Sequence, residues 1–387
     1  VLKKSTPLFN RDKRYNLRGA FIKMPLNSDI IFALDIGTRT VKGIVCQKEE
    51  NGLKILAESI CEHDSRSMID GQIHDIDKVS QVVIKVKQDL EEKVGFALKD
   101  AAIAAAGRTL KTKCVHVEKD LTADTDIDDI MINSLELSGV NEAYTLIKKE
   151  SKYIKDDFYC VGYSVVSYYL NGYPITSLVE HNGRFIGADL LATFLPGSVV
   201  GSLYKVLEKS SLNPICLTLE PIAALEAVVP ENIRLLNIAL IDIGAGTSDI
   251  AITKRGSIAG YGMVSVAGDE VTEALADDYL LGFNSAEALK RSVGGRRKKV
   301  SFKDITGNKV TLKAEDVALK ICDVSKKIAH EIASEVLSLN GCAPRAVFCV
   351  GGGSHTLGLI DALSSELGMD RQRIAVKKRS SIPNLDT

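Results

Sequence analysis

The sequence predicts an α/β protein built from two related domains, and three observations support this fold class. First, a strand–turn–strand segment at residues 239–252, ALIDIGAGTSDIAI, has a counterpart at residues 31–46, IFALDIGTRTVKGIVC. Second, an apolar strand at residues 347–350 runs into three consecutive glycines. Third, a chain of 387 residues is long enough for two domains with separate cores.

Each repeated segment is expected to form a β-hairpin whose turn can hold an anion. Two apolar runs separated by a glycine-containing turn are typical of a hairpin, and glycine lets backbone N–H groups approach a ligand closely. The segments share the pattern D-I-G-x-x-T, with the aspartate ending the incoming strand. Such an aspartate can hold a hydrated Mg²⁺. For either segment alone, the alternative is an ordinary tight turn whose Asp and Thr satisfy only turn hydrogen bonds.

Two such hairpins and a late glycine cluster resemble the actin-like ATPase superfamily, which includes actin, DnaK-type chaperones and sugar kinases. The resemblance implies an actin-like two-domain fold in which ATP is clamped between two phosphate-binding turns. It also implies that Asp35 and Asp242 hold Mg²⁺ through water. The residues implied to bind the nucleotide around its phosphates are Asp35, Gly37, Thr38, Arg39, Gly244, Ala245, Gly246, Thr247, Asp249, Gly351, Gly352 and Gly353.

Residues 217–229, LTLEPIAALEAVV, resemble the first connecting helix of that superfamily. Pro221 suits the first helical turn, and the helix dipole favours the carboxylate of Glu220 there. Hydrolysis of ATP needs a group that orients water, so Glu220 and Asp242 are the candidate catalytic residues. The alternative for Glu220 is a carboxylate that interacts only with the helix dipole.

Several further motifs resemble the bacterial cell-division protein FtsA. Residues 70–79 match the FtsA pattern DGxIxDIxxV, and residues 268–272 match most of its GGdxvT segment, with Ala267 in place of the first glycine. Residues 285–291, SAEALKR, are similar to the AExLK helix, which implies that Glu287 and Lys290 approach the ribose and adenine. An exposed Glu–Lys pair on a helix surface is the alternative for these two residues.

The FtsA resemblance also implies a small module, 1C, inserted into the first domain. The alternative for this module is a simple elaboration of that domain. The predicted division is a basic N-terminal arm at residues 1–28, domain 1A at 29–107 and 188–235, the 1C-like insertion at 108–187, domain 2A at 236–267 and 316–387, and subdomain 2B at 268–315.

Apolar spacing places the helices within this plan. A period of 3.6 residues predicts helices at 77–95, with Asp77 as N-cap and Gly95 as stop, and at 198–209 and 317–339. An acidic segment at 125–137 predicts a helix start in the insertion, and another helix is expected at 357–367. The basic run GGRRKK at 294–299 is interpreted as a solvated hairpin loop, with a partner contact as the alternative.

Composition excludes several other classes of protein. A net charge of −1 and an isoelectric point near 6.7 argue against nucleic acid as a partner. Eight cysteines without CxxC or metal-binding spacing are typical of reduced thiols in a cytoplasmic protein. No apolar run approaches the ~18 residues of a membrane span, and no signal peptide is evident. The basic arm is expected to be disordered, with a weak membrane-surface contact as the alternative.

The resemblance implies an ATP-binding, FtsA-type adaptor that forms filaments, links an FtsZ-like division polymer to the membrane, and is at most a weak ATPase. FtsA continues into an amphipathic membrane-targeting helix, whereas residues 379–387 are a polar tail. Attachment to the inner face of the cell membrane is therefore not expected from this chain itself. The alternatives are a DnaK-like chaperone, a pilus-assembly adaptor, and a small-molecule kinase of the same superfamily.

Overall fold

A computed structural model of the chain describes residues 29–49, 52–64, 66–106, 109–151, 157–293, 298–377 and 385–386. Three predicted features fall partly or wholly outside these residues. They are the basic arm at 1–28, the first four residues of the basic run at 294–299, and most of the polar tail at 379–387.

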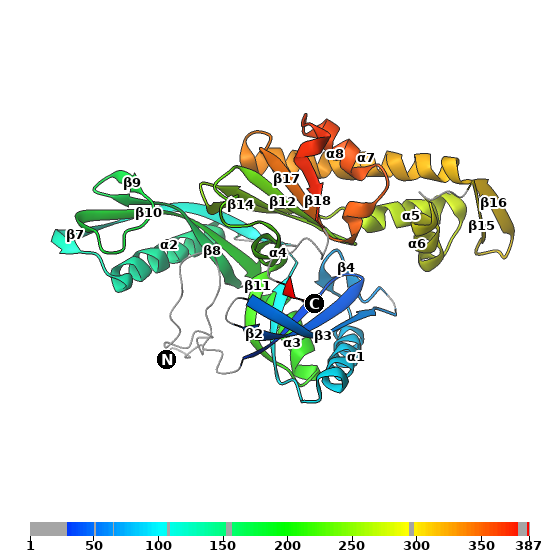
Figure 1. Cartoon of the computed structure of the whole chain (residues 1–387), viewed down its shortest axis with the longest axis horizontal. Helices are drawn as coiled ribbons and strands as arrows, with labels where there is room; N and C mark the ends of the chain where they lie inside the picture. Colours follow the sequence, from blue (N-terminus) through cyan, green and yellow to red (C-terminus); the bar gives the residue numbers. More distant parts are fainter. Residues whose placement is uncertain are drawn as a thin grey trace.

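The first domain is built on a six-stranded sheet with the order β11-β6-β1-β2-β3-β19. Its centre is the predicted first hairpin, in which β1 and β2 pair antiparallel, while β6 and β11 extend the sheet in parallel. Helices α1 and α3 pack together below the sheet (Figure 1). The elements are β1 (Ile30–Ile36), β2 (Thr40–Glu49), β3 (Gly52–Glu62), β4 (Met68–Ile69), β5 (Gln72–Ile73), α1 (Ile76–Val94), β6 (Asp100–Ala105), α3 (Gly197–Lys209), β11 (Asn213–Leu219) and β19 (Leu385–Asp386).

The predicted helix at 77–95 is confirmed as α1, with one correction at its start. The N-cap is Asp75 rather than Asp77, because the Asp75 carboxylate accepts a hydrogen bond of 3.0 Å from the backbone N–H of Lys78. At the other end Gly95 has φ of 79°, the left-handed conformation that ends helices and favours glycine. The buried side of α1 carries the predicted apolar residues Val79, Val82, Val83, Val86 and Leu90.

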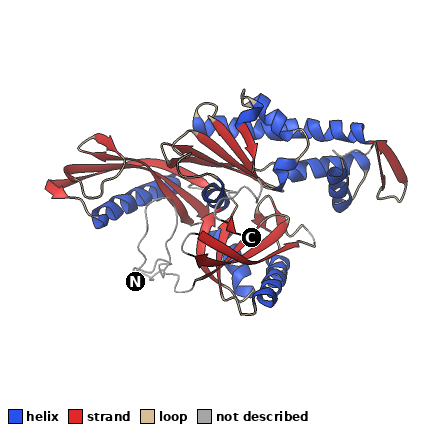
Figure 2. Cartoon of the chain, viewed as in Figure 1, coloured by secondary structure: helices blue, strands red, loops and turns tan. Residues whose placement is uncertain are grey.

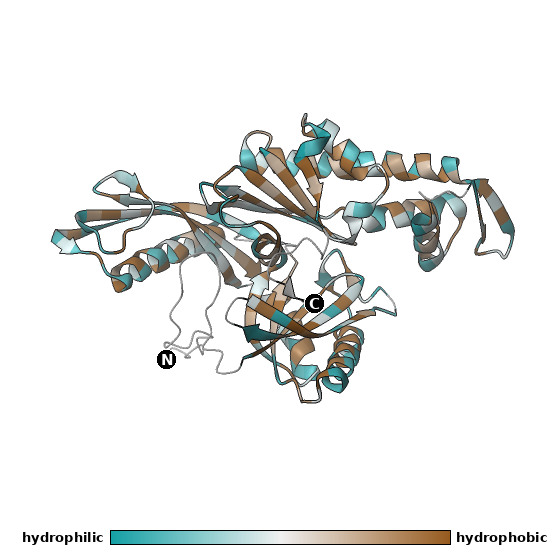
Figure 3. Ribbon diagram, viewed as in Figure 1, coloured by the Kyte–Doolittle hydropathy of each residue, from teal (hydrophilic) through white to brown (hydrophobic). Residues whose placement is uncertain are grey.

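The second domain contains a five-stranded sheet with the order β14-β13-β12-β17-β18. The predicted second hairpin, β12 and β13, lies at its centre, and its strands are apolar on both faces (Figure 3) because helices cover one side and the first domain approaches the other. The elements are α4 (Glu220–Val228), β12 (Ile238–Ile243), β13 (Ser248–Lys254), β14 (Ser257–Val264), α7 (Ala314–Asn340), β17 (Ala346–Val350), the 3₁₀ turn η1 (Gly352–His355), α8 (Leu359–Glu366), the 3₁₀ turn η2 (Arg371–Arg373) and β18 (Ile374–Val376).

A smaller unit extends the second domain on the right of Figure 1. It consists of α5 (Gly268–Tyr279), α6 (Phe283–Ser292) and a two-stranded ribbon of β15 (Lys299–Lys303) and β16 (Lys309–Lys313). One face of the ribbon, with Val300, Phe302 and Leu312, packs against the core of this domain.

The inserted segment of the first domain has its own sheet and core on the left of Figure 2. Its four strands have the order β7-β10-β8-β9, and α2 packs against them. The helix begins at Asp129 rather than at residue 125, because β7 continues to Asp126 through pairing with β10. The predicted boundary at 187 falls inside β10. The elements are β7 (Lys111–Asp126), α2 (Asp129–Glu150), β8 (Phe158–Leu170), β9 (Tyr173–Ile175) and β10 (Asn182–Pro196).

Candidate functional site

A cleft of about 730 Å³ lies between the two domains, where the turns of the two hairpins face each other. The structure brings most of the predicted site residues together along its walls. Gly246 and Asp249 are the two predicted residues that do not line it. Those that do are Asp35, Gly37, Thr38, Arg39, Glu220, Asp242, Gly244, Ala245, Thr247, Glu287, Lys290, Gly351, Gly352 and Gly353.

The two hairpin turns have matching backbone geometry. The N–H of Gly37 donates to the carbonyl of Thr40 at 3.0 Å, and the N–H of Gly244 donates to the carbonyl of Thr247 at 2.9 Å. A Cβ atom at either glycine would stand 3.2 Å from the same carbonyl, which is tighter than most side-chain contacts. Both turns therefore require glycine at their first position for the same steric reason.

The strand registers place a charged residue opposite each aspartate. Asp35 is paired with Lys42 across the first hairpin, and Asp242 is paired with Asp249 across the second. The ammonium of Lys42 lies 2.9 Å from the Asp35 carboxylate and lines the cleft. Lys42 was not among the predicted site residues. The pairing register of the first hairpin was the signal that could have identified it.

Three carboxylates, those of Asp35, Glu220 and Asp242, share one end of the cleft. Burial, and then the nearby charge of Asp35, raise the pKa of Asp242 to about 6. Burial, followed by repulsion from Asp35, Asp249 and Asp242, raises the pKa of Glu220 well above its ordinary value. Burial opposes the charge of Lys42, but its attraction to Asp35 outweighs this and raises the pKa of the ammonium. Additional positive charge in the cleft would therefore stabilise the ionised carboxylates.

The donor set fits a hydrated divalent cation. Glu220 Oε1 is buried and has no hydrogen-bond partner among the described residues. In that part of the chain, no three His, Cys, Asp or Glu side chains are close enough to ligate a metal ion directly. Mg²⁺ keeps several waters and takes few direct protein ligands, so carboxylates that act through water and ligand phosphates suit it.

The glycine cluster packs directly against the second hairpin. A Cβ atom at Gly351, where φ is 81°, would collide with the Asp242 carboxylate and the Ile243 carbonyl. A Cβ atom at Gly353 would stand 2.6 Å from the Gly244 carbonyl. The predicted helix after the cluster, α8, begins at Leu359, so the cleft is bordered by the turn and the short η1 rather than by the helix itself.

Glu287 and Lys290 line the cleft and form a half-buried polar network there. The ammonium of Lys290 lies 2.6 Å from the Glu287 carboxylate and donates to the Gly268 carbonyl and the Thr272 hydroxyl, both at 2.8 Å. Burial favours a protonated Glu287, but hydrogen bonds from Arg39, Lys290 and Thr272 outweigh it and lower the pKa of this carboxyl. The pair is therefore not a solvated surface pair, which was the alternative for it.

Arg39 extends from the first hairpin across the cleft and pairs with two acidic residues of the second domain. Its guanidinium contacts the carboxylates of Asp269 and Glu287, and it lies 5.3 Å from the centre of the Phe283 ring. Both ion pairs are largely shielded, with side-chain exposures of 12–18%.

A second arginine reinforces this contact. Arg66 pairs with Glu273 at 2.5 Å and lies 5.1 Å from the same Phe283 ring. We call the contacts of Arg39 and Arg66 with α5 and α6 the arginine clamp. The arginine clamp could not be predicted from the sequence, because its partners are more than 200 residues apart in the chain.

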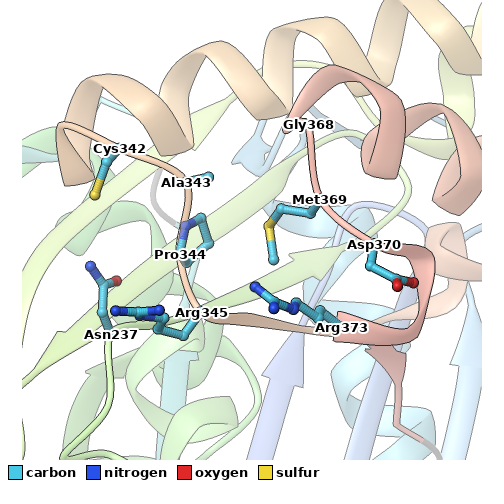
Figure 4. A pocket seen from close by; sticks show the side chains of 9 residues that line it. All are labelled: Asn237, Cys342, Ala343, Pro344, Arg345, Gly368, Met369, Asp370 and Arg373. Carbon is cyan, nitrogen blue, oxygen red and sulfur yellow. The ribbon is translucent and has the colours of Figure 1, made fainter.

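A second cavity, of about 660 Å³, lies at the opposite end of the second domain's sheet (Figure 4). It is lined at the edge where β12, β17 and β18 begin, by residues that include Asn237, Arg345, Met369 and Arg373. Its charged residues are exposed, and none of the predicted site residues lines it.

No helix within the described residues is long and apolar enough to cross a membrane.

The comparisons with known proteins agree with this fold and with the FtsA-like motifs. The family model described as "Cell division protein FtsA" matches residues 239–385. FtsA of Streptococcus pneumoniae serotype 2 is 23% identical over 368 residues, which span 91% of this chain and 76% of that protein. FtsA of Bacillus subtilis is 22% identical over 363 residues, spanning 90% of this chain and 79% of that protein.

Two solved structures share the architecture at low sequence identity. A chain of the PilM–PilN type IV pilus biogenesis complex has a TM-score of 0.61 at 16% identity, with 90% of each chain covered. The ethanolamine utilization protein EutJ from Carboxydothermus hydrogenoformans has a TM-score of 0.50 at 18% identity, with 91% of this chain and 86% of that chain covered. The chain therefore has the actin-like ATPase fold, and over most of its length its sequence is FtsA-like.

Proposed function

We propose that this chain is a cytoplasmic, ATP-binding protein of the FtsA type, which assembles into filaments and links a division polymer to the inner face of the cell membrane. The observation that carries the proposal is the pair of matched hairpins that face each other across one cleft, with Asp35 and Asp242 at corresponding positions. The FtsA-like sequence supports the choice of this branch of the fold.

Charge complementarity supports ATP with Mg²⁺ as the ligand. The backbone N–H groups of residues 38–39 and 245–246 in the two turns would hold the phosphates from both sides. Mg²⁺ would neutralise part of the phosphate charge, and Asp35 and Asp242 would hold it through water. Lys42, beside Asp35, would add a cation on the first-domain side. Glu287, Lys290 and Thr272 would provide polar groups for the ribose and base.

The raised pKa of Glu220 would make any hydrolysis depend on cation binding. A general base must be ionised to accept a proton from water, and burial and the neighbouring carboxylates raise the pKa of Glu220, which disfavours its ionised form in the ligand-free cleft. Binding of the cation would lower this pKa, so Glu220 becomes competent only when the cleft is loaded. ATP would then act mainly as a ligand that selects the closed arrangement of the two domains.

A pilus-assembly adaptor is the second candidate. Its support is the fold similarity to a chain of the PilM–PilN complex, at a TM-score of 0.61. Both candidates would bind nucleotide in the same cleft, and filament assembly would favour the first. A small-molecule kinase or a chaperone would differ from both by turnover that depends on a second substrate.

Sedimentation of the purified chain with Mg-ATP, with Mg-ADP and without nucleotide tests the proposal, with phosphate release measured in parallel. We expect ATP-dependent pelleting with little phosphate release, and loss of pelleting in Asp242→Asn. The exposed-surface variant Asp277→Asn is the matched control and should pellet like the wild type. A chain that binds ATP and stays monomeric would favour the pilus-type adaptor. Turnover stimulated by a peptide or metabolite would contradict both adaptor functions.

A further inference from the structure

The outer face of the β15–β16 ribbon is a basic surface. Alternation along the two strands puts Lys299, Ser301 and Lys303 on one face, together with Lys309, Thr311 and Lys313, and all six are exposed. We call this the lysine face. It lies at the far end of the molecule from the inserted sheet (Figure 1). The opposite face of the ribbon carries Val300, Phe302 and Leu312 and is packed.

The lysines of this face stand directly opposite each other. Lys299 pairs in register with Lys313, and Lys303 pairs with Lys309, on either side of a hydrogen bond of 2.8 Å between the hydroxyls of Ser301 and Thr311. Like charges directly opposite each other destabilise an antiparallel pair. Within the described part of the chain, none of these four lysines forms an ion pair. The fold thus keeps two repulsive pairs exposed without neutralising them.

The turn of the ribbon adds an exposed apolar tip. Asp304, the one acidic residue between 298 and 313, is turned inward and accepts hydrogen bonds from the N–H groups of Thr306 and Asn308. Ile305 is 70% exposed, and its N–H donates to the carbonyl of Leu280, which is itself 54% exposed. An exposed isoleucine therefore lies two residues from Lys303, at the tip of the ribbon.

We propose that the lysine face and its Ile305 tip form a docking site for an anionic phospholipid surface. Lysine is a flexible point charge without the bidentate geometry of arginine, so it suits mobile headgroup phosphates better than a fixed pattern of carboxylates. An exposed isoleucine beside lysines can enter the boundary between headgroups and acyl chains while the ammonium groups remain at the phosphates. The contact does not use the cleft and does not require the nucleotide function proposed above.

Flotation of the full chain with lipid vesicles tests this site. One set of vesicles contains equal amounts of phosphatidylglycerol and phosphatidylcholine, and the other contains phosphatidylcholine alone. We expect binding only to the anionic vesicles, weakened by salt. Each lysine near an anionic surface contributes about fivefold in affinity, so Lys303→Glu/Lys309→Glu should reduce binding by at least about twentyfold. Ile305→Ser should reduce the binding that remains at high salt.

Two controls separate this site from a general charge effect. Lys54→Glu/Lys327→Glu changes the net charge equally at two exposed lysines outside the ribbon, and its binding should stay within about twofold of wild type. The variant Lys303→Glu/Lys309→Glu still has like charges opposite each other in the ribbon. Its thermal stability should therefore match that of the wild type. Lys303→Gln/Lys309→Gln is a milder variant of the same test and should give an intermediate loss.

Three outcomes would overturn the proposal. They are absence of vesicle binding by the wild type, equal losses in the ribbon and control variants, and binding of polyglutamate by the ribbon without binding of anionic vesicles. The last result would assign the lysine face to an acidic protein instead. Because all measurements are made without ATP, they fail or succeed separately from the proposed function of the cleft.

Discussion

The two hairpins that form the cleft have the same backbone geometry but differ in charge at two corresponding positions. Aligned from Asp35 and Asp242, they have the same glycine and the same turn hydrogen bond. Lys42 of the first hairpin corresponds to Asp249 of the second, and Arg39 corresponds to Gly246. The shared turn geometry therefore positions the site. The residues at two divergent positions decide which charges and contacts each domain contributes to it.

The first hairpin supplies cations, and the second supplies close backbone packing. A Cβ atom at Gly246 would stand 3.0 Å from the Cα atom of Asp70 and 3.2 Å from Cγ2 of Thr38, both in the first domain. The N–H of Gly71 donates to the Thr38 hydroxyl at 3.0 Å, so the turn between β4 and β5 supports the first hairpin and touches the second. Arginine at position 246 would not fit, and glycine at position 39 would remove the Arg39 contacts of the arginine clamp while leaving those of Arg66.

The largest effect should come from removing the aspartate that has no lysine beside it. Asp242→Asn should weaken Mg-ATP binding by about 100-fold, because a group that holds a metal through water contributes about 10–100-fold to its affinity. Asp35→Asn should weaken Mg-ATP binding by only about tenfold, because Lys42 already compensates part of the charge of Asp35. Titration calorimetry at fixed Mg²⁺ measures both. Equal losses in the two variants would contradict the asymmetry, and Asp277→Asn is the unaffected control.

The raised pKa of Asp242 predicts a pH-dependent stability difference between wild type and Asp242→Asn. The folded pKa is about 6 and the ordinary value is 3.8, so the folded protein binds the additional proton between these values. The stabilisation is present at low pH and is lost as the pH rises through about 6. The wild type should therefore lose about 2 kcal/mol relative to the variant between pH 4 and 7. Thermal melting without nucleotide measures this, and a constant difference would contradict it.

Replacing the cation of the first hairpin should have a smaller effect on binding. Lys42→Met removes one positive charge within reach of the phosphates, which at the effective dielectric of a partly buried site corresponds to about tenfold in ATP affinity. Lys42→Asp, which copies Asp249 into the first hairpin, should reduce the affinity further. A titration at two salt concentrations separates charge from packing, because the loss in Lys42→Met should shrink as salt increases. A loss that is independent of salt would indicate packing instead.

The smallest of the predicted effects concerns domain opening in Arg39→Gly, the variant that gives the first hairpin the glycine found at position 246 of the second. Arg39→Gly removes the ion pairs with Asp269 and Glu287, so the second domain should open more often from the first. We expect amide exchange in α5 and α6 to accelerate about fivefold, corresponding to the loss of about 1 kcal/mol of shielded, charged hydrogen bonding. Exchange in β12 should not change.

Arg291→Gln is the matched control for Arg39→Gly. Arg291 contacts Glu287 at 2.8 Å within α6 and Glu62 across the cleft at 3.9 Å, but its side chain is 61% exposed, so its replacement should change amide exchange in α5 and α6 less than twofold. Equal exchange in wild type and Arg39→Gly would show that the clamp does not hold the domains together.

The sequence was sufficient for features carried by local pattern. The repeated D-I-G-x-x-T segments and the glycine cluster predicted the hairpins, the actin-like fold and eleven of the residues that line the cleft. The sequence was not sufficient for features that depend on how strands pair or how the two domains meet. Lys42 depends on the register of β1 with β2, the helix start at Asp129 depends on the length of β7, and the arginine clamp depends on how two domains meet. The predicted domain boundaries, nucleotide contacts and metal ligands remain predictions.

Helix α6 lies between the arginine clamp and the lysine face. Helix α6 presents Glu287 to Arg39 and also packs against β15, whose outer face carries the lysines. If occupancy of the lysine face changes the affinity of the cleft for nucleotide by some factor, thermodynamic reciprocity requires nucleotide to change the affinity of the lysine face by the same factor. Measuring either coupling would fix the other, and a factor of one would mean that α6 transmits nothing between the two surfaces.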